Sequence, residues 1–176
     1  LVGSEMCIRD RGGVIDTWLR RGAAGFRLDV ADELPDSFIE KVRTAVKRVS
    51  PDKFLLGEVW EDATTKFGFD KRRTYLLGKG LDSVMNYPFK NAVLGFVCGR
   101  DAGQTMTDIL TLCEHYPAPA MDTALNFLST HDTERALTVI ADEPANGRGR
   151  EWQSGRCVTG EAYEEGMLRL RMAYAI

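Results

Sequence analysis

Residues 25–33 read GFRLDVADE, and this stretch decides how the rest of the chain is interpreted. Apolar residues at positions 26, 28 and 30 alternate with Arg27 and Asp29, which is the two-residue period of a β-strand. We therefore predict a strand from Gly25 to Val30 that carries Arg27 and Asp29 on one face. An arginine placed in this way can hold a neighbouring acid in its charged form by ion pairing.

The sequence on either side alternates helices with strands. Residues 14–21 have the spacing of an amphipathic helix, and Pro35 and Asp36 begin a helix that runs to about residue 49. Further strands are predicted at 54–59, 83–87 and 125–130, further helices at 72–77, 92–97, 106–115, 133–140 and 161–176, and a long loop at 146–160. The fold class is therefore α/β with parallel β/α units, which either close into a barrel or stack into a doubly wound sheet. Four such units make about half of an eight-stranded barrel.

The composition is that of a globular chain and excludes several classes of protein. Of the 176 residues, 44% are hydrophobic and 28% are charged, and the net charge is −3 with the basic residues scattered. We therefore predict no nucleic-acid partner and no membrane partner. No apolar run approaches the roughly 18–20 residues that span a bilayer, and no signal peptide is visible, so a cytoplasmic location is favoured. The four cysteines lie far apart without a C-x-x-C pair, which predicts free thiols.

Acidic residues follow three of the four predicted strands. Asp29 follows GFRL, Glu58 follows FLLG and Asp132 follows NFLSTH. In a parallel β/α barrel the loops at the carboxyl ends of the strands converge on one mouth, where active sites are built. Retaining cleavage of a glycosidic bond needs one ionised carboxylate and one protonated carboxyl about 5–5.5 Å away. Arg27 would keep Asp29 ionised, whereas the apolar run before Glu58 would favour its protonated form.

Six further residues are candidates for substrate binding, and each has a structural alternative. The alternatives are a buried structural ion pair for the first arginine, helix capping for the histidine, core packing for the aromatic residues, and a solvated position at the start of a helix for the second arginine and the glutamate. The six candidates are Arg27, Glu33, Trp60, Tyr87, His131 and Arg135.

Four segments resemble the α-amylase family of glycoside hydrolases. GFRLDVADE is similar to the second conserved region of that family, LLGEVWED to the third and FLSTHDTER to the fourth, while LDSVMNYPF at 81–89 is similar to the strand-six segment of the neopullulanase and cyclomaltodextrinase branch. The resemblance implies a partial (β/α)8 TIM barrel, approximately strands four to seven with their helices. It also implies a retaining glycoside hydrolase that acts on α-glucosidic linkages of α-glucans or maltooligosaccharides.

The resemblance assigns a role to each matching residue. Asp29 would be the nucleophile, Glu58 the general acid/base, and Asp132 the third carboxylate, which stabilises the oxocarbenium-like transition state. Arg27 would orient Asp29, and His131 would bind substrate at the cleavage subsite. Glu33 resembles the residue that shapes acceptor-side specificity in the neopullulanase branch.

The chain also departs from the family pattern. The first conserved region and the strands before it find no match, and neither does strand eight. We therefore expect residues 1–11 (LVGSEMCIRDR) to be a non-native leader and 12–176 to be part of a glycosidase TIM-barrel catalytic domain that is inactive alone. No cofactor is required, although some relatives bind a structural calcium, and the parent protein is a candidate homodimer.

Three alternatives to hydrolysis remain open at this stage. Transglycosylation or isomerisation would use the same three acids with a different acceptor. A metal-dependent barrel enzyme would use them as Mg²⁺ ligands, but it needs a lysine or histidine base that the neighbouring strand ends do not supply convincingly. A non-catalytic relative would retain the fold alone, and such proteins typically lose the acids.

Overall fold

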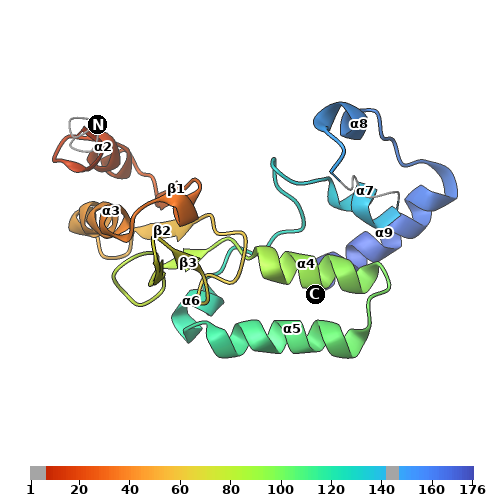
Figure 1. Ribbon diagram of the computed structural model, residues 1–176. Helices are drawn as coiled ribbons and strands as arrows, with labels where there is room; N and C mark the ends of the chain where they lie inside the picture. The colour runs from red at the N-terminus through yellow and green to blue at the C-terminus, as the bar shows by residue number, and fades with distance from the viewer. Residues whose placement is uncertain (1–6, 142–146) are drawn as a thin grey trace. The chain divides into compact units, whose positions relative to one another are not determined.

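The computed structural model describes residues 7–141 and 147–176, which form two compact units. The sheet unit comprises the described residues up to Asn86 together with Cys113–Leu125. The helical unit comprises Tyr87–Leu112 and the described residues from Asn126 to Ile176. Figure 1 shows the chain coloured from red at the N-terminus to blue at the C-terminus.

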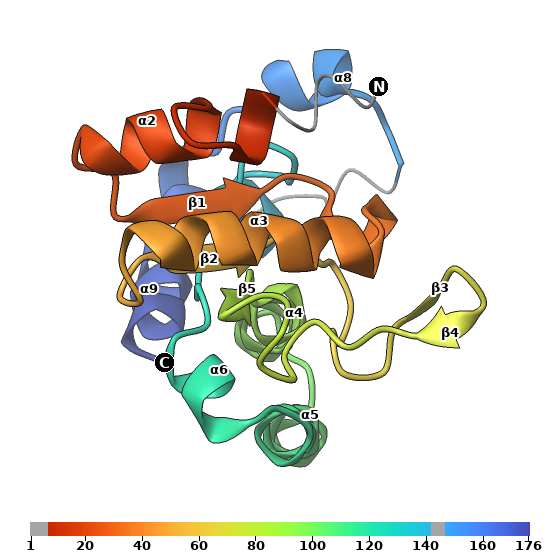
Figure 2. The same ribbon diagram turned by 90° about the vertical axis from the view of Figure 1, so that its left-hand side faces the viewer.

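The sheet unit is built on parallel strands in the order β1-β2-β5, and Met85, which follows β5, makes one further parallel bridge to Leu125. Helix α3 lies alongside β1 and β2 and returns the chain between them (Figure 2). A separate antiparallel pair, β3 and β4, follows β2. The elements are α2 (Val14–Arg20), β1 (Gly25–Leu28), the 3₁₀ helix η1 (Ala31–Glu33), α3 (Asp36–Val49), β2 (Phe54–Gly57), β3 (Phe67–Gly68), β4 (Lys71–Arg72), β5 (Ser83–Val84) and α6 (Ala118–Asp122).

Helix α3 is fixed to the sheet by an apolar stripe and by one buried acid. The buried residues of the helix are Ile39, Val42, Ala45 and Val46, so the stripe lies close to the predicted one. Asp82 accepts hydrogen bonds from Arg43 Nη1 at 2.7 Å, from Lys47 Nζ at 2.8 Å and from the backbone N–H of Leu55 at 2.8 Å. Burial opposes ionisation of Asp82, but these donors outweigh it and lower the pKa of its carboxyl.

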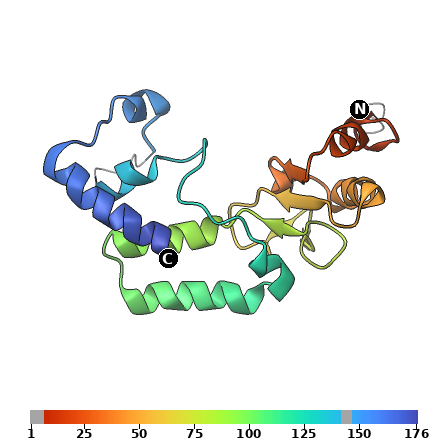
Figure 3. The same cartoon turned by 180° about the vertical axis from the view of Figure 1, so that it is seen from behind.

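The helical unit packs its helices around a small apolar core. The members of this core are Val93, Leu94, Val97, Ala136, Ile140 and Ala173. Helix α9 packs against both α4 and α7, and Figure 3 shows it in blue beside α4. The elements are α4 (Tyr87–Val97), α5 (Ala102–His115, of which the part up to Leu112 belongs to this unit), α7 (Ala136–Ala141), α8 (Arg150–Ser154) and α9 (Gly160–Ala175).

Most of the predicted elements are present with shifted ends. The two strands that precede the acids each end one or two residues early, at Leu28 and Gly57. The third predicted strand is much shorter, because Tyr87 begins a helix. Pro88 is compatible with the first turn of that helix, where the missing N–H is not needed. The predicted loop at 146–160 contains α8, while its first residue and residues 1–6 of the predicted leader lie outside the described part of the chain.

Two predicted elements are wrong. The strand expected at 125–130 appears only as the single bridge at Leu125, because its neighbour β5 gives way to α4 at Tyr87 and offers no longer ladder. The short helix expected at 72–77 is replaced by the end of β4 and by turns. The four cysteines are free and exposed, as predicted. No helix within the described residues is long and apolar enough to cross a membrane.

Candidate active site

One guanidinium joins the first two predicted acids. Arg27 Nη1 lies 2.6 Å from Asp29 Oδ1, and Arg27 Nη2 lies 3.0 Å from Glu58 Oε2. The ion pair expected from the alternation at 25–30 is therefore present, and it extends to the next strand. Because both carboxylates contact one planar group, they are held within the width of a guanidinium and two polar contacts of each other.

The backbone brings these acids together as well. Strands β1 and β2 pair in parallel up to Leu28 and Gly57, and the Glu58 N–H donates to the Leu28 carbonyl at 2.9 Å. Asp29 and Glu58 are thus the next residues along two adjacent strands, which lie about 4.8 Å apart. Gly57 permits close packing at this point, because a Cβ there would lie 2.2 Å from a side-chain carbon of Leu81.

The two carboxylates have different surroundings. The side chain of Asp29 is 72% exposed, whereas that of Glu58 is 5% exposed. Glu58 Oε2 also accepts a hydrogen bond from the Val30 N–H at 3.0 Å, and Glu58 Oε1 accepts one from Trp60 Nε1 at 3.2 Å. One acid is therefore open to a ligand, while the other is fixed in place by three groups.

Val30 adopts an unusual backbone conformation that serves this arrangement. Its φ and ψ are both 46°, which is the left-handed region that β-branched residues rarely occupy. Such a conformation costs about 1–3 kcal/mol and persists only where the surrounding structure enforces it. Here the turn ends β1 and directs the Val30 N–H at Glu58.

The remaining candidates of the sheet unit lie close to this pair along the chain. Trp60 is 44% exposed and donates to Glu58, so its ring is not part of the core. Glu33 is exposed in η1, immediately after the turn at Val30. The structure thus places both residues where a ligand at Asp29 can be reached.

In the helical unit, His131 and Asp132 form a pair of their own. His131 Nε2 lies 2.9 Å from Asp132 Oδ2, and Arg150 Nη2 lies 3.8 Å from Asp132 Oδ1. A cavity of about 290 Å³ opens beside them and is lined in part by His131, Arg135 and Arg150. Arg135 is exposed just before α7.

Tyr87 is in a different situation from the other candidates. It is 1% exposed at the start of α4, and its ring packs edge-on against Phe127 with the centroids 4.8 Å apart. This burial leaves no free ring face for a sugar in this arrangement, so the role of Tyr87 as a substrate platform stays a prediction.

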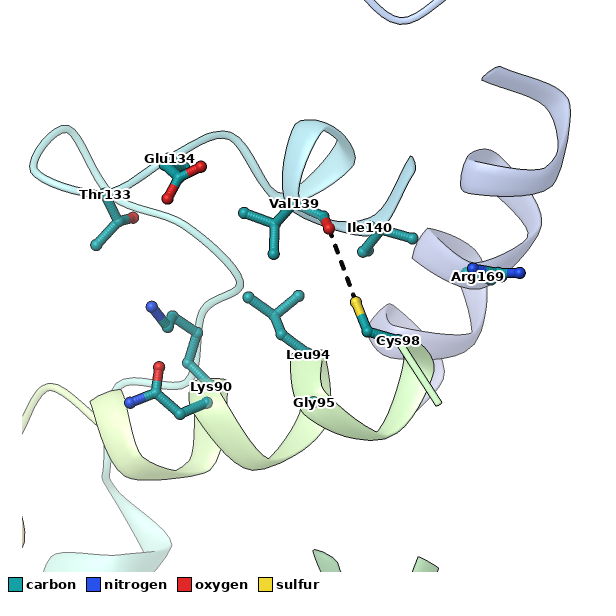
Figure 4. A pocket seen from close by; sticks show the side chains of 10 residues that line it. Lys90, Leu94, Gly95, Cys98, Thr133, Glu134, Val139, Ile140 and Arg169 are labelled. Atoms are coloured by element: carbon teal, nitrogen blue, oxygen red, sulfur yellow. Dashed lines mark hydrogen bonds between the residues drawn. The ribbon is translucent and has the colours of Figure 1, made fainter. Parts of the chain in front are cut away.

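A second cavity in the helical unit, of about 660 Å³, is shown in Figure 4. Burial lowers the pKa of Lys90 in this cavity, and nearby Glu134 partly opposes the shift. The Cys98 thiol donates to the Val139 carbonyl at 3.8 Å, and burial raises its pKa. With Glu134 as its one carboxylate, this cavity offers no pair of acids for glycosidic cleavage. Within either unit, the described residues include no group of three or more His, Cys, Asp or Glu side chains placed to hold a metal ion.

Sequence reasoning missed one buried residue that supports the site. The side chain of Arg73 is fully buried and donates to Asp36 Oδ1 and to the Asp32 carbonyl, both at 2.7 Å, and also to the Leu34 carbonyl. These acceptors lie in the segment that follows Asp29. No periodic signal in KRRTY marked Arg73 as buried, and the run of basic residues suggested a solvated loop instead.

Parallel strands that each lead into a loop with an acid are the construction of a (β/α)8-barrel enzyme site. Comparison with known proteins defines the family. The family model "Alpha amylase, catalytic domain" matches residues 3–154, so the match begins inside the segment 1–11, and the prediction of a leader there stays a prediction. The chain belongs to the α-amylase family and is part of its (β/α)8-barrel catalytic domain.

Individual relatives support this assignment. The cyclomaltodextrinase of Geobacillus thermopakistaniensis is 38% identical over 129 residues, which cover 72% of this chain and 20% of the relative. Neopullulanase 2 of Thermoactinomyces vulgaris is 36% identical over 133 residues, 74% of this chain and 21% of the relative. The solved cyclic α-maltosyl-(1→6)-maltose hydrolase of Arthrobacter globiformis superposes with a TM-score of 0.65 at 34% identity, over 73% of this chain and 28% of that one. The chain thus spans about a fifth of the length of the curated relatives it matches.

Proposed function

We propose that this chain carries the catalytic carboxylates of a retaining glycoside hydrolase acting on α-glucosidic linkages of α-glucans or maltooligosaccharides. The observation that carries the proposal is the Arg27 guanidinium, which contacts both Asp29 and Glu58 at the ends of adjacent strands. Adjacent parallel strands supply the separation of about 5 Å that a double displacement needs. The names of the relatives, which include a cyclomaltodextrinase and a neopullulanase, support glucans as the substrate class.

In the first step, a carboxylate oxygen of Asp29 attacks the anomeric carbon. The bond from that carbon to the glycosidic oxygen breaks, and the proton of Glu58 passes to the leaving oxygen. In the second step, Glu58 removes a proton from water, whose oxygen attacks the same carbon and releases Asp29. The exposure of Asp29 suits the attacking group, and the fixed position of Glu58 suits a proton donor aimed at one atom.

The other candidates act around this pair. Arg27 holds Asp29 in position and ionised, because two donors on one rigid group constrain its carboxylate. Asp132 stabilises the positive charge that develops on the sugar ring, and His131 and Arg135 bind sugar hydroxyls. Trp60 offers an aromatic face, while Glu33 contacts the acceptor sugar.

Two carboxylates complete this chemistry, so we propose that it needs no cofactor. A structural calcium, dimerisation of the whole protein and a cytoplasmic location belong to the proposal as well, since the comparisons do not address them. Transglycosylation would proceed through the same glycosyl–Asp29 intermediate with a sugar in place of water.

A chimera tests the proposal directly. The matched 129-residue segment of the Geobacillus cyclomaltodextrinase is replaced by its counterpart from this chain, and hydrolysis of maltotriose is followed. Glu58→Gln is expected to lower kcat by about 10²–10⁴-fold, because general acid catalysis is lost. Glu40→Gln, which alters an exposed acid on α3, is the control and keeps full activity. An active chimera in which Glu58→Gln has no effect would refute the assignment.

A further inference from the structure

A two-residue hairpin stands at the carboxyl end of the sheet, and the catalytic proposal gives it no task. Strands β3 and β4 pair Phe67 with Arg72 and Gly68 with Lys71, so only Phe69 and Asp70 form the turn. Both turn residues have positive φ, 54° and 60°, as type I′ turns require. Figure 2 shows the hairpin extending on the side toward which the β1 arrow points.

The base of the hairpin is fixed to the segment that leaves the active site. Arg73, directly after β4, is the buried arginine that donates to Asp36 and to the Asp32 carbonyl. Lys66, directly before β3, lies 3.3 Å from Asp32 Oδ2. Because Asp32 is three residues from Asp29, the hairpin is held at the same end of the sheet as the nucleophile.

The tip of the hairpin carries aromatic side chains that folding does not account for. Phe67 is 70% exposed and Phe69 is 58% exposed. A left-handed conformation costs an ordinary residue about 1–2 kcal/mol, and Asn, Asp or Gly is preferred in such turns. Phe69 therefore occupies a strained position while leaving most of its ring in solvent. Strain of this kind, held by an anchored loop, points to a function.

The charges around the tip favour a neutral ligand. Lys66 is paired with Asp32 and Glu61, and Lys71 with Asp36. These basic side chains are thus neutralised by acids within the same unit, which leaves the exposed aromatic rings as the feature available for binding. A flat apolar ring face suits the C–H face of a neutral sugar, as in other ligand sites lined by aromatic residues.

We propose that the β3–β4 hairpin is a sugar-binding platform, on which Phe67 and Phe69 stack against glucose units of an α-glucan chain bound beyond Asp29 and Glu58. The inference rests on the proposed function, because it assigns the hairpin to the same substrate. It makes the hairpin a determinant of chain-length preference that takes no part in bond cleavage.

The test is a titration of the 176-residue chain with maltoheptaose, followed by NMR. The variant Phe69→Asn is expected to weaken binding about three- to tenfold, the effect of losing one aromatic contact. Its thermal stability is expected to be unchanged or higher, since Asn suits the left-handed turn. Trp18→Ala, which removes another exposed aromatic side chain of the sheet unit, is the control and should leave binding unchanged.

Three outcomes would overturn the platform. These are equal binding by Phe69→Asn and the wild-type chain, no binding by the wild-type chain at millimolar maltoheptaose, and self-association that Phe69→Asn abolishes, which would make a second copy the partner. None of these changes the activity of the chimera or its loss in Glu58→Gln, so failure of the platform is distinguishable from failure of the proposed function.

Discussion

The two units hold their charged side chains in different ways. In the sheet unit, Arg73 is fully buried and both Asp36 and Asp82 are largely buried, each with two or more hydrogen-bonding partners. In the helical unit, ion pairs such as Arg169–Glu165 lie at the surface, and the side chain of Asp132 is 35% exposed. The difference shows that an acid at a predicted strand end becomes a fixed site only where the neighbouring strand is also formed.

The largest expected effect compares one acid from each unit. In the chimera, Asp29→Asn should lower kcat on the order of 10⁴-fold, because no covalent intermediate can form. Asp132→Asn should lower it by about 10²–10³-fold, since an electrostatic contribution to the transition state is lost. The measurement is kcat for maltotriose. Equal losses would contradict the division of roles between the two units.

The next effect concerns stability. Arg73→Met should destabilise the sheet unit by about 3–5 kcal/mol, because it leaves Asp36 buried without its main partner. Arg169→Met in the helical unit should change stability by less than about 0.5 kcal/mol, because its partner Glu165 is exposed. Urea unfolding of the 176-residue chain, followed by NMR signals assigned to each unit, measures both. A small effect of Arg73→Met would show that the buried network is not needed.

Acid should act on the same network. Burial opposes ionisation of Asp36, but hydrogen bonds from Lys71 and Arg73 outweigh it, so its pKa is lowered from 3.8. A lowered folded-state pKa stabilises the fold above the unfolded-state value, and this stabilisation disappears as the pH falls below about 3.8 toward the folded-state pKa. Unfolding of the sheet unit at pH 6 and pH 3 should therefore differ, and Asp36→Asn should reduce the difference. An unchanged pH dependence in Asp36→Asn would contradict this.

The smallest expected effect concerns backbone strain. Among the described residues, those with positive φ other than glycine are Val30, Phe69 and Asp70, all in the sheet unit. Val30→Gly should relieve the left-handed strain and leave stability unchanged or raise it by up to about 1 kcal/mol. It keeps the N–H that binds Glu58, so activity of the chimera should persist. Marked destabilisation in urea would show that the Val30 side chain matters more than its conformation.

The sequence predicts the parts of the molecule that depend on local pattern. Alternation at 25–30 gave the first strand and the Arg27–Asp29 pair, because both follow from a two-residue period. Amphipathic spacing and Pro35 gave helix α3 almost to the residue. Asp29 and Glu58 could be placed together because the ends of adjacent parallel strands share one edge.

Other features depend on tertiary contacts that no local pattern records. The missing strand at 125–130 depends on where its neighbour stops, and that is set by the helix beginning at Tyr87. The burial of Arg73 depends on three acceptors more than thirty residues earlier in the sequence. The left-handed turn at Val30 is a strained state that propensity argues against, as is typical of sites kept for function.

The most direct test of the central claim is to trap the covalent intermediate. The chimera is incubated with 5-fluoro-α-D-glucopyranosyl fluoride, whose good leaving group favours formation of the glycosyl–enzyme and whose ring fluorine slows its hydrolysis. Trypsin cleaves after Arg27 and Lys41, so the account predicts a fluoroglucosyl mass on peptide 28–41, which fragmentation assigns to Asp29. A label on Glu58 or Asp132, or an active enzyme that turns over this reagent without ever carrying a label, would contradict it.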